Sequence, residues 1–402
     1  MKFQIHTAPE EHDAFVLKST QCDLLQSSNW AKVKDNWGSE IVSVLDNNND
    51  DEIIASALVL IKKLPAGFSM LYIPRGPILD YGNPHLLAFF FDELRKWAKT
   101  QKALFIKFDP NLVYESSKFG EEAVLNEKTK EYLAAIQAIG AEHFGFNLVM
   151  GETIQPRVQA NEKLPAENIE SIYPKHTLRR IKEAQKRDVK VARVGQEGLE
   201  EFARLIELTV ARKGVALRNL EYFRKLMNLY GDDAYLHLAT VNIASKKTEL
   251  TEKLAQVEQD LAETPEHQKK RITRLNEQIY SFKTMLEELD GFEDSEGDTT
   301  IAGILSIKFG DTVEMLYAGM DEKFKKYYPQ YLLYTLDFND AIAAGAKWAN
   351  MGGIEGTLDD GLSKFKSNFN PDVQRLIGEF TIKTSPLAGL GLWAYNKRKS
   401  SN

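Results

Sequence analysis

The chain has a single cysteine, Cys22, and no run of apolar residues long enough to cross a bilayer. One thiol cannot form an internal disulfide, nor can it supply a thiolate metal cluster. A membrane-spanning helix needs roughly 18–20 consecutive apolar residues. Residues 1–6 lead straight into acidic residues and contain no apolar signal core. These absences predict a cytoplasmic protein without a transmembrane segment.

Several catalytic motifs are also absent. The seven histidines lack metal-ligand spacing, and neither a Walker loop nor a Gly-x-Ser-x-Gly segment occurs. The pyrophosphate loop of acetyl-coenzyme A enzymes, Gln/Arg-x-x-Gly-x-Gly/Ala, has one near match at 137–142, where its last position is Glu142. A carboxylate there would repel a pyrophosphate. The sequence therefore predicts no metal site and no cofactor, and it disfavours a coenzyme A-dependent N-acetyltransferase, which stays the first alternative.

The composition is that of a globular protein with uneven charge. Hydrophobic residues make up 43% and charged residues 27% of a 402-residue chain, which is long enough for two domains. The net charge of −7 argues against a nucleic-acid binder coated in positive charge. Basic residues nevertheless cluster at 175–190 and 397–399. Such patches attract phosphates or an anionic membrane surface, and a solvated helix face has the same composition.

Two stretches with heptad spacing interrupt this pattern. Apolar residues recur in alternating steps of four and three at 250–261 and again at 272–289, which is typical of a coiled-coil seam. Pro265 lies between them and resists helix continuation. The sequence predicts an antiparallel coiled-coil arm, each helix roughly 30 Å long. An arm of this kind suits an enzyme that reaches for a large partner; a non-catalytic scaffold is the second alternative.

The rest of the chain repeats one order of strands and helices. The first unit has strand-like runs at 41–45, 53–61, 68–73 and 103–108, with helices at 85–97 and 131–139. The second has strands at 189–194, 235–243, 301–309, 312–317 and 348–351, with helices at 198–212 and 328–344. Antiparallel meanders in both units argue against a doubly wound parallel sheet.

We therefore predict an α/β (α+β) chain of two tandem acetyltransferase (GNAT)-like subdomains. The first covers residues 1–150. The second covers 151–244 and 298–402. The coiled-coil arm, 245–297, is inserted in the second, at the tip of a hairpin between Ile243 and Ile301.

Two segments carry candidate cations. Residues 30–37 place two tryptophans on one helical face with Lys34 beside it, a pattern that an ordinary amphipathic helix also shows. Arg218 follows Gly214 and stands near the start of a new helix. A guanidinium at a helix N-terminus suits a bidentate contact with phosphate or carboxylate, although a surface ion pair would look the same in sequence.

A third candidate region begins with the turn Gly352–Gly356, where backbone can approach a ligand closely. Lys364 and Lys366 follow, on either side of Phe365. We expect one of the two lysines to point into a cleft.

Taken together, these segments resemble the FemABX family of non-ribosomal peptidyltransferases over almost the whole chain. The matching segments are Ser28–Trp37, Pro74–Pro77, Phe105–Pro110, Thr153–Arg157, Tyr317–Asp321, Gly352–Gly356 and Phe365-Lys366. Where the family has a small polar residue and a histidine before its arginine, this chain has Ala216-Leu217.

The resemblance implies transfer of Ala, Ser or Gly from aminoacyl-tRNA to the side-chain amine of the third stem-peptide residue. The acceptor would be a peptidoglycan precursor, either lipid II or UDP-MurNAc-pentapeptide, and the transfer would build the interpeptide bridge. By resemblance, Lys34 and Arg218 hold the acceptor's diphosphate, and Lys366 stabilises the oxyanion of the reacting ester. Asp109 matches a carboxylate considered as a general base. The residues expected to line the acceptor groove are Trp37, Tyr222, Tyr317 and Phe365.

Contacts with the larger partners are expected at two basic sites. Arg179, Arg180 and Lys182 are predicted to bind tRNA, with contact to the inner membrane leaflet as the alternative. Lys269, Lys270 and Arg271 near the arm's tip are the other tRNA candidates, unless the arm serves dimerisation. The sequence leaves a monomer and a homodimer equally open.

Overall fold

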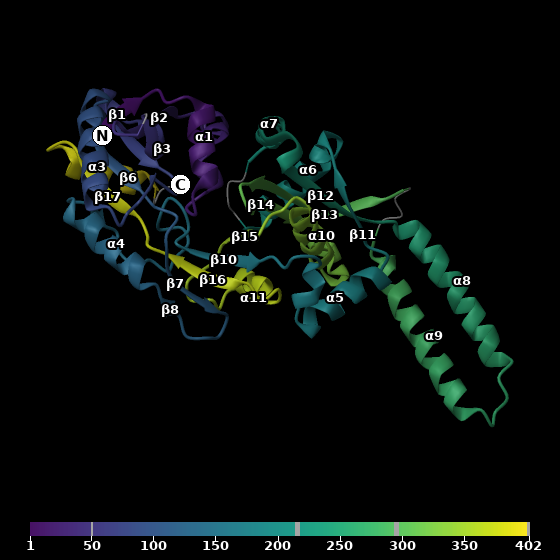
Figure 1. Cartoon of the computed structure of the whole chain (residues 1–402). Coiled ribbons are helices and arrows are strands. Elements are labelled where there is room, and N and C mark those ends of the chain that lie inside the picture. The colour runs from purple at the N-terminus through teal and green to yellow at the C-terminus, as the bar shows by residue number, and fades with distance from the viewer. Residues whose placement is uncertain (50, 214–217, 293–296, 400–402) are drawn as a thin grey trace.

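The computed structural model describes residues 1–49, 51–213, 218–292 and 297–399. Figure 1 shows two α/β halves side by side, with a pair of long helices projecting from the second half. Both chain termini lie on the first half (Figure 1).

The first sheet carries the N-terminal meander. Its strand order is β1 (Lys2–Ile5), β2 (Gly38–Asp46), β3 (Glu52–Lys63), β4 (Ser69–Ile73), β6 (Ala103–Phe108), β17 (Phe380–Lys383) and β9 (Glu142–His143), with β5 (Ile78–Leu79) paired to β3. Strands β2, β3 and β4 are antiparallel neighbours, whereas β4 and β6 run parallel. Helix α3 (Pro84–Thr100) connects that parallel pair, and its buried Phe90, Phe91 and Leu94 pack in the core of this half.

The second sheet repeats this order. Its strands run β11 (Lys190–Val194), β12 (Ala234–Val241), β13 (Thr299–Phe309), β14 (Thr312–Met320), β15 (Trp348–Gly353), β10 (Val158–Lys163), β16 (Asp372–Leu376), β7 (Val113–Lys118) and β8 (Val124–Leu125). Strands β12, β13 and β14 form an antiparallel meander, and β14 and β15 pair in parallel across α10 (Pro329–Ala343). The predicted fold class, two α/β units with antiparallel meanders, is confirmed.

The two halves exchange strands. β7 and β8 come from the first part of the sequence but extend the second sheet, whereas β17, near the C-terminus, lies beside β6 in the first sheet. These exchanges tie both halves together through backbone hydrogen bonds. The predicted subdomain boundary at residue 150 therefore does not coincide with the division between the two sheets. It stays a prediction.

The other helices are α1 (Pro9–Lys18), α2 (Ser28–Val33), α4 (Glu127–Ala138), α5 (Lys175–Lys186), α6 (Leu199–Lys213), α7 (Leu220–Tyr230), α8 (Ile243–Ala262), α9 (Lys269–Asp290), α11 (Gly361–Ser367) and α12 (Ala388–Lys399). Two of the predicted boundaries that were wrong bear on the site and on the arm. The helix expected over residues 30–37 ends at Val33, so Trp37 lies beyond it. The strand expected to reach Ile243 ends at Val241, because the Asn242 side chain accepts a hydrogen bond from the Ser245 backbone and caps α8.

Helices α8 and α9 form the hairpin predicted from the heptads. The ion pairs Lys247–Asp290 (3.8 Å) and Glu258–Lys283 (2.9 Å) join the helices in antiparallel order. Every predicted seam residue is at least partly buried, while most positions between them are exposed. Leu250 and Leu289, at the base, belong to the core of the second half. The arm joins β12 to β13, whose pairing is intact beside it.

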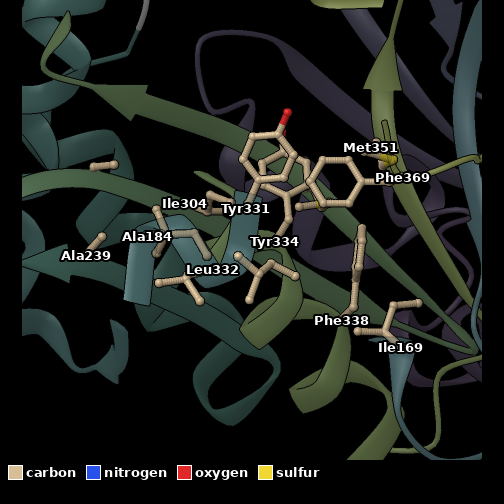
Figure 2. Close-up of a cluster of buried hydrophobic side chains, with 14 of the residues drawn as sticks. Ile169, Ala184, Ala239, Ile304, Tyr331, Leu332, Tyr334, Phe338, Met351 and Phe369 are labelled. Carbon is tan, nitrogen blue, oxygen red and sulfur yellow. The ribbon is translucent and has the colours of Figure 1, made fainter. Parts of the chain in front are cut away.

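An aromatic cluster anchors the end of the second half that carries α11 (Figure 2). Tyr334 of α10 stacks on Phe369 with ring centroids 5.1 Å apart, and Phe338 meets Phe369 edge-on at 6.1 Å. Phe369 follows α11 directly, so its burial fixes the position of that short helix. Large buried aromatic surfaces supply much of a core's stability.

A buried histidine lies between two carboxylates under α10. His237 Nε2 is 2.8 Å from Asp340 Oδ2, and its Nδ1 is 3.0 Å from Asp337 Oδ1, the latter a close charge pair without good hydrogen-bond geometry. Burial alone lowers the pKa of His237, but the two carboxylates outweigh burial and raise it overall. The imidazolium form is therefore favoured in the folded protein.

We expect this site to make stability depend on pH. Because the folded pKa of His237 lies above its unfolded value of about 6.5, its contribution is complete below that value and is lost as pH rises through the folded pKa. The midpoint of thermal unfolding should fall between pH 6 and 9 more steeply for the parent than for His237→Gln. The exposed His85→Gln is the matched control and should follow the parent. Equal slopes for parent and His237→Gln would contradict the assignment.

Candidate functional site

Lys34 and Arg218, which are far apart in sequence, line one pocket of about 320 Å³. Lys34 is the residue that ends α2, while Arg218 precedes Asn219, whose side chain caps α7 by accepting from the Tyr222 backbone. The full lining is Val33, Lys34, Asp35, Asn36, Arg218, Asn219 and Tyr222. Lys34 and Arg218 therefore lie together, as holding one diphosphate would require, and their role stays a prediction.

The pocket is electropositive. Burial, and after it the charge of Arg218, lowers the pKa of Lys34 to about 8. Asp35 also lines the pocket, but its carboxylate pairs with Lys225. Among the described residues, no carboxylate forms an ion pair with Lys34 or Arg218. Two neighbouring cations that no described carboxylate pairs with make a site that an anion with two negative groups would stabilise.

Aromatic side chains extend from this pocket. The Arg218 guanidinium lies 5.1 Å from the Tyr222 ring centroid, and the Tyr317 hydroxyl donates to the Tyr222 hydroxyl at 3.3 Å. Trp37 follows Lys34 by three residues and packs against Tyr72, with ring centroids 6.3 Å apart. Three of the four residues predicted to line the groove, Trp37, Tyr222 and Tyr317, therefore lie in or next to the Lys34 region.

Asp109 is buried and fully engaged with protein groups. It accepts hydrogen bonds from the Tyr72 hydroxyl (3.0 and 3.1 Å) and from the Arg75 backbone N–H (2.8 Å). Burial is the main cause that raises its pKa to about 7. Tyr72, which packs on Trp37, connects Asp109 to the aromatic region.

Lys366 lies where two parallel strands diverge. Pairing between β14 and β15 stops at Glu314 and Asn350, although both strands continue. Lys366, only 4% exposed, donates from Nζ to the carbonyl oxygens of Gly352 (3.1 Å) and Gly353 (2.9 Å) on the β15 side of this fork. Tyr317 lies on the β14 side.

Of the two lysines, Lys366 is buried and Lys364 is exposed, so one of them does point inward. That it faces a cleft stays a prediction. Both lysines lie on the helix α11. Gly352 has φ +84°, a left-handed conformation that glycine adopts without strain, and this turns the strand end toward the ammonium. Lys366 does not line the pocket of Lys34 and Arg218. The hydroxyl contact between Tyr222 and Tyr317 joins that pocket to strand β14, which forms the other side of the fork.

The fourth predicted groove residue, Phe365, has other neighbours. Its ring packs against Tyr331, Tyr334 and Phe369 at centroid distances of 5.3–5.7 Å, and Figure 2 labels these three residues. The half-buried Phe365 thus holds α11 against the core, and its groove role stays a prediction. The departure at Ala216-Leu217 lies outside the described residues.

The predicted tRNA contacts fall in two places. Arg179 and Lys182 are exposed on α5, but Arg180 donates to the Tyr328 hydroxyl at 2.7 Å and stacks on that ring at 4.3 Å. The other three, Lys269, Lys270 and Arg271, are exposed at the start of α9, at the far end of the arm (Figure 1). The ion pair Arg187–Glu288 (2.7 Å) fixes the end of α5 near the arm's base.

Several buried charges near Asp109 had no role in the sequence-based hypothesis. Lys107 pairs with Glu379 in the interior, and Glu379 also accepts from the Ile154 backbone at 3.0 Å. Arg75 donates to the Pro156 carbonyl at 2.8 Å. Arg75 and Lys107 lie in segments that carried the family resemblance, and that resemblance could have drawn attention to them. Glu379 lies in none of those segments.

Neither a metal cluster nor a membrane-spanning helix is found in the described parts of the chain. No group of three or more His, Cys, Asp or Glu side chains there is placed to hold an ion. Likewise, no described helix combines the length and apolarity that crossing a bilayer requires.

Comparison with known proteins agrees with the fold. Residues 7–392 match the model of the FemAB family. The chain is 28% identical to a lipid II:glycine glycyltransferase of Staphylococcus aureus, over 94% of this chain and 92% of that protein. It is 27% identical to the protein of that name from Staphylococcus saprophyticus, covering 96% and 94%. The crystal structure of FemX superposes with a TM-score of 0.78 and 26% identity, over 97% of this chain and 99% of that one. The chain therefore belongs to the FemAB family and is a transferase.

Proposed function

We propose that this transferase moves a small amino acid from aminoacyl-tRNA to the side-chain amine of the third stem-peptide residue in a peptidoglycan precursor. The single observation that carries the proposal is the pocket in which Lys34 and Arg218 meet without an ion-paired carboxylate among the described residues. A diphosphate joins sugar to carrier in both lipid II and its UDP-linked form. Two neighbouring cations suit its two phosphates.

The acceptor would extend from the pocket toward the fork between β14 and β15. With the diphosphate on Lys34 and Arg218, the sugar would lie along Tyr222 and Tyr317, whose hydroxyls are in contact. Tyr317 stands on one side of the fork and Lys366 on the other. The stem-peptide amine would meet the donor ester at that place.

The chemistry needs no covalent enzyme intermediate. The neutral amine attacks the ester carbonyl, an amide bond forms, and the ester C–O bond to the tRNA ribose breaks. The amine proton passes to the leaving ribose hydroxyl. The Lys366 ammonium, held by two carbonyl oxygens, would stabilise the negative charge on the ester oxygen. Because an aminoacyl ester is already activated, positioning and water exclusion can supply much of the rate.

Asp109 fits a positioning role better than that of a base. Its hydrogen bonds go to Tyr72 and Arg75, and through Tyr72 it supports Trp37. We propose that Asp109 fixes the positions of Tyr72 and Trp37 at the base of the groove.

For the donor residue, the names of the staphylococcal relatives favour glycine. Alanine and serine are the alternatives. Comparing glycyl-, alanyl- and seryl-tRNA as donors in one transfer assay decides among them, and absence of transfer from all three would overturn the proposal.

The coenzyme A alternative loses support from the structure. The near match at 137–142 begins at the C-terminal end of α4 and continues past Gly140 into β9. A helix C-terminus carries partial negative charge and offers carbonyl groups, whereas a pyrophosphate needs the N–H groups of an N-terminus. Glu142 itself pairs with Lys383.

Acceptor binding should weaken as pH rises. The pKa of Lys34 is lowered to about 8, so its charge is lost between pH 7 and 9 in the free enzyme. We expect affinity for the UDP-linked acceptor, measured by calorimetry, to fall about tenfold over that range. In Lys34→Arg the dependence should disappear, because arginine stays charged. Lys32→Met, an exposed neighbour on α2, is the control and should keep the parent profile; an unchanged profile in Lys34→Arg would contradict the role of Lys34.

Lys366→Met should lower turnover far more than it weakens acceptor binding. If the ammonium acts only where charge develops, kcat should fall roughly 100- to 1000-fold, with little change in the KM for the acceptor. Lys364→Met, the exposed lysine on the same helix, should leave both constants near the parent values. Equal losses in kcat and acceptor affinity would remove the transition-state role.

Donor binding should depend on both basic sites. Each double or triple variant, Arg179→Gln/Lys182→Gln on α5 and Lys269→Gln/Lys270→Gln/Arg271→Gln on the arm, should weaken aminoacyl-tRNA binding. Each should also reduce the slope of log affinity against log salt, by about 0.7–0.9 for every tRNA phosphate that the variant no longer neutralises. Lys96→Gln/Lys99→Gln on α3 is the control. Unchanged affinity in the arm variant would dismiss the arm's tRNA role.

A further inference from the structure

Helix α12 presents large apolar side chains to solvent. Leu390 is 66% and Trp393 60% exposed, and Leu387, just before the helix, is also exposed. The opposite face, with Ala388, Leu392 and Tyr395, packs into a core cluster of the protein. Residues three and four apart share a helix face, so Leu390, Trp393 and Lys397 form one outward stripe. A surface helix ordinarily turns polar residues outward.

A largely apolar pocket of about 710 Å³ lies beside this stripe. It is bounded by α12 on one side and by the end of β3 and the following turn on the other. The lining includes Leu390, Leu387 and Phe68, with Lys62 and Lys63 also in its wall. Leu390 thus belongs to both the pocket and the outward stripe, which makes them one continuous apolar surface.

Lysine side chains flank that surface. The Lys397 ammonium lies 5.2 Å from the Trp393 ring centroid, and Lys63 is exposed at the pocket. Apolar side chains with tryptophan among them, edged by lysines, are suited to the boundary between headgroups and acyl chains.

We propose that α12 and the neighbouring β3–β4 turn dock on an anionic lipid bilayer surface. Leu387, Leu390 and Trp393 enter the headgroup boundary, and Lys63 and Lys397 face the lipid phosphates. A second copy of this chain fits less well, because a symmetric contact would bring Lys397 near its own counterpart.

The docking surface lies next to the proposed acceptor region. The Lys62 ammonium is 5.1 Å from the Trp37 ring centroid and 5.3 Å from that of Tyr395 on α12. A bilayer held at α12 would therefore present a lipid-linked acceptor close to Trp37. This consequence rests on the proposed function, whereas the docking itself does not.

The test measures sedimentation of the full chain with vesicles, in the absence of tRNA and acceptor. We expect binding to vesicles that contain phosphatidylglycerol and much weaker binding to phosphatidylcholine alone. Leu390→Ser/Trp393→Ser should reduce binding to the anionic vesicles roughly tenfold or more. Lys397→Glu should reduce it several-fold. Tyr280→Ser, which removes a 75% exposed ring on the arm, is the matched control and should bind like the parent.

Two further readouts keep the outcome clear. Transfer to the soluble UDP-linked acceptor should persist in Leu390→Ser/Trp393→Ser, which shows that the variant folds. If no variant or parent transfers at all, the proposed function fails while vesicle binding still stands. Should the double variant not fold, quenching of parent tryptophan emission by brominated lipid, absent in Trp393→Phe, gives the same information.

Three results would overturn the proposal. They are absence of parent binding to anionic vesicles, equal binding of parent and Leu390→Ser/Trp393→Ser, and self-association of the parent that the double variant abolishes. The last result would assign the surface to a second copy of the chain.

Discussion

The packing of α2 against α7 is the contact on which the candidate site depends. It holds two cations from distant parts of the sequence in one pocket, although like charges repel. The Asn29 amide donates to the Leu229 carbonyl at 2.9 Å, and the Ser27 and Tyr230 hydroxyls are 2.7 Å apart. Lys225 pairs with Asp35 across the same contact. These bonds offset the cost of burying Lys34 and of its repulsion with Arg218, which, in that order, lower the pKa of Lys34.

This arrangement favours the binding of an anion. The pocket's lysine is partly desolvated and lies near a guanidinium, so a negatively charged group placed there would offset charge that burial leaves poorly solvated. In the proposed complex, the acceptor's diphosphate would supply that negative charge and raise the pKa of Lys34 again. Under the proposed function, acceptor binding and protonation of Lys34 are therefore coupled.

Local sequence patterns predicted much of the secondary structure and pointed to the cations of the candidate site, because both depend on residues that are neighbours in the sequence. The strand Ala103–Phe108 was recognised with its observed limits, and the arm was predictable from its heptads. In contrast, the pairing of β17 with β6 joins residues more than 270 positions apart, and nothing in either strand specifies its partner. Glu379 escaped notice for that reason, since its importance arises only when β17 brings it beside Lys107. The resemblance implied a groove role for Phe365, but successive helix residues point in different directions, and its half-buried ring packs against the core.

The strand exchange also bears on how the site is kept rigid. Glu379, next to β17, forms an ion pair with Lys107 of the first sheet. It also accepts a hydrogen bond from the Ile154 backbone, in the segment that connects β9 to β10. Arg75 reaches the same segment at Pro156, while its backbone N–H donates to Asp109. A buried charge left without its partner is costly, so these groups resist separation of the two halves. The cations at α2 and α7 can then stay close without a ligand, because the interior behind them cannot relax by letting the halves move apart.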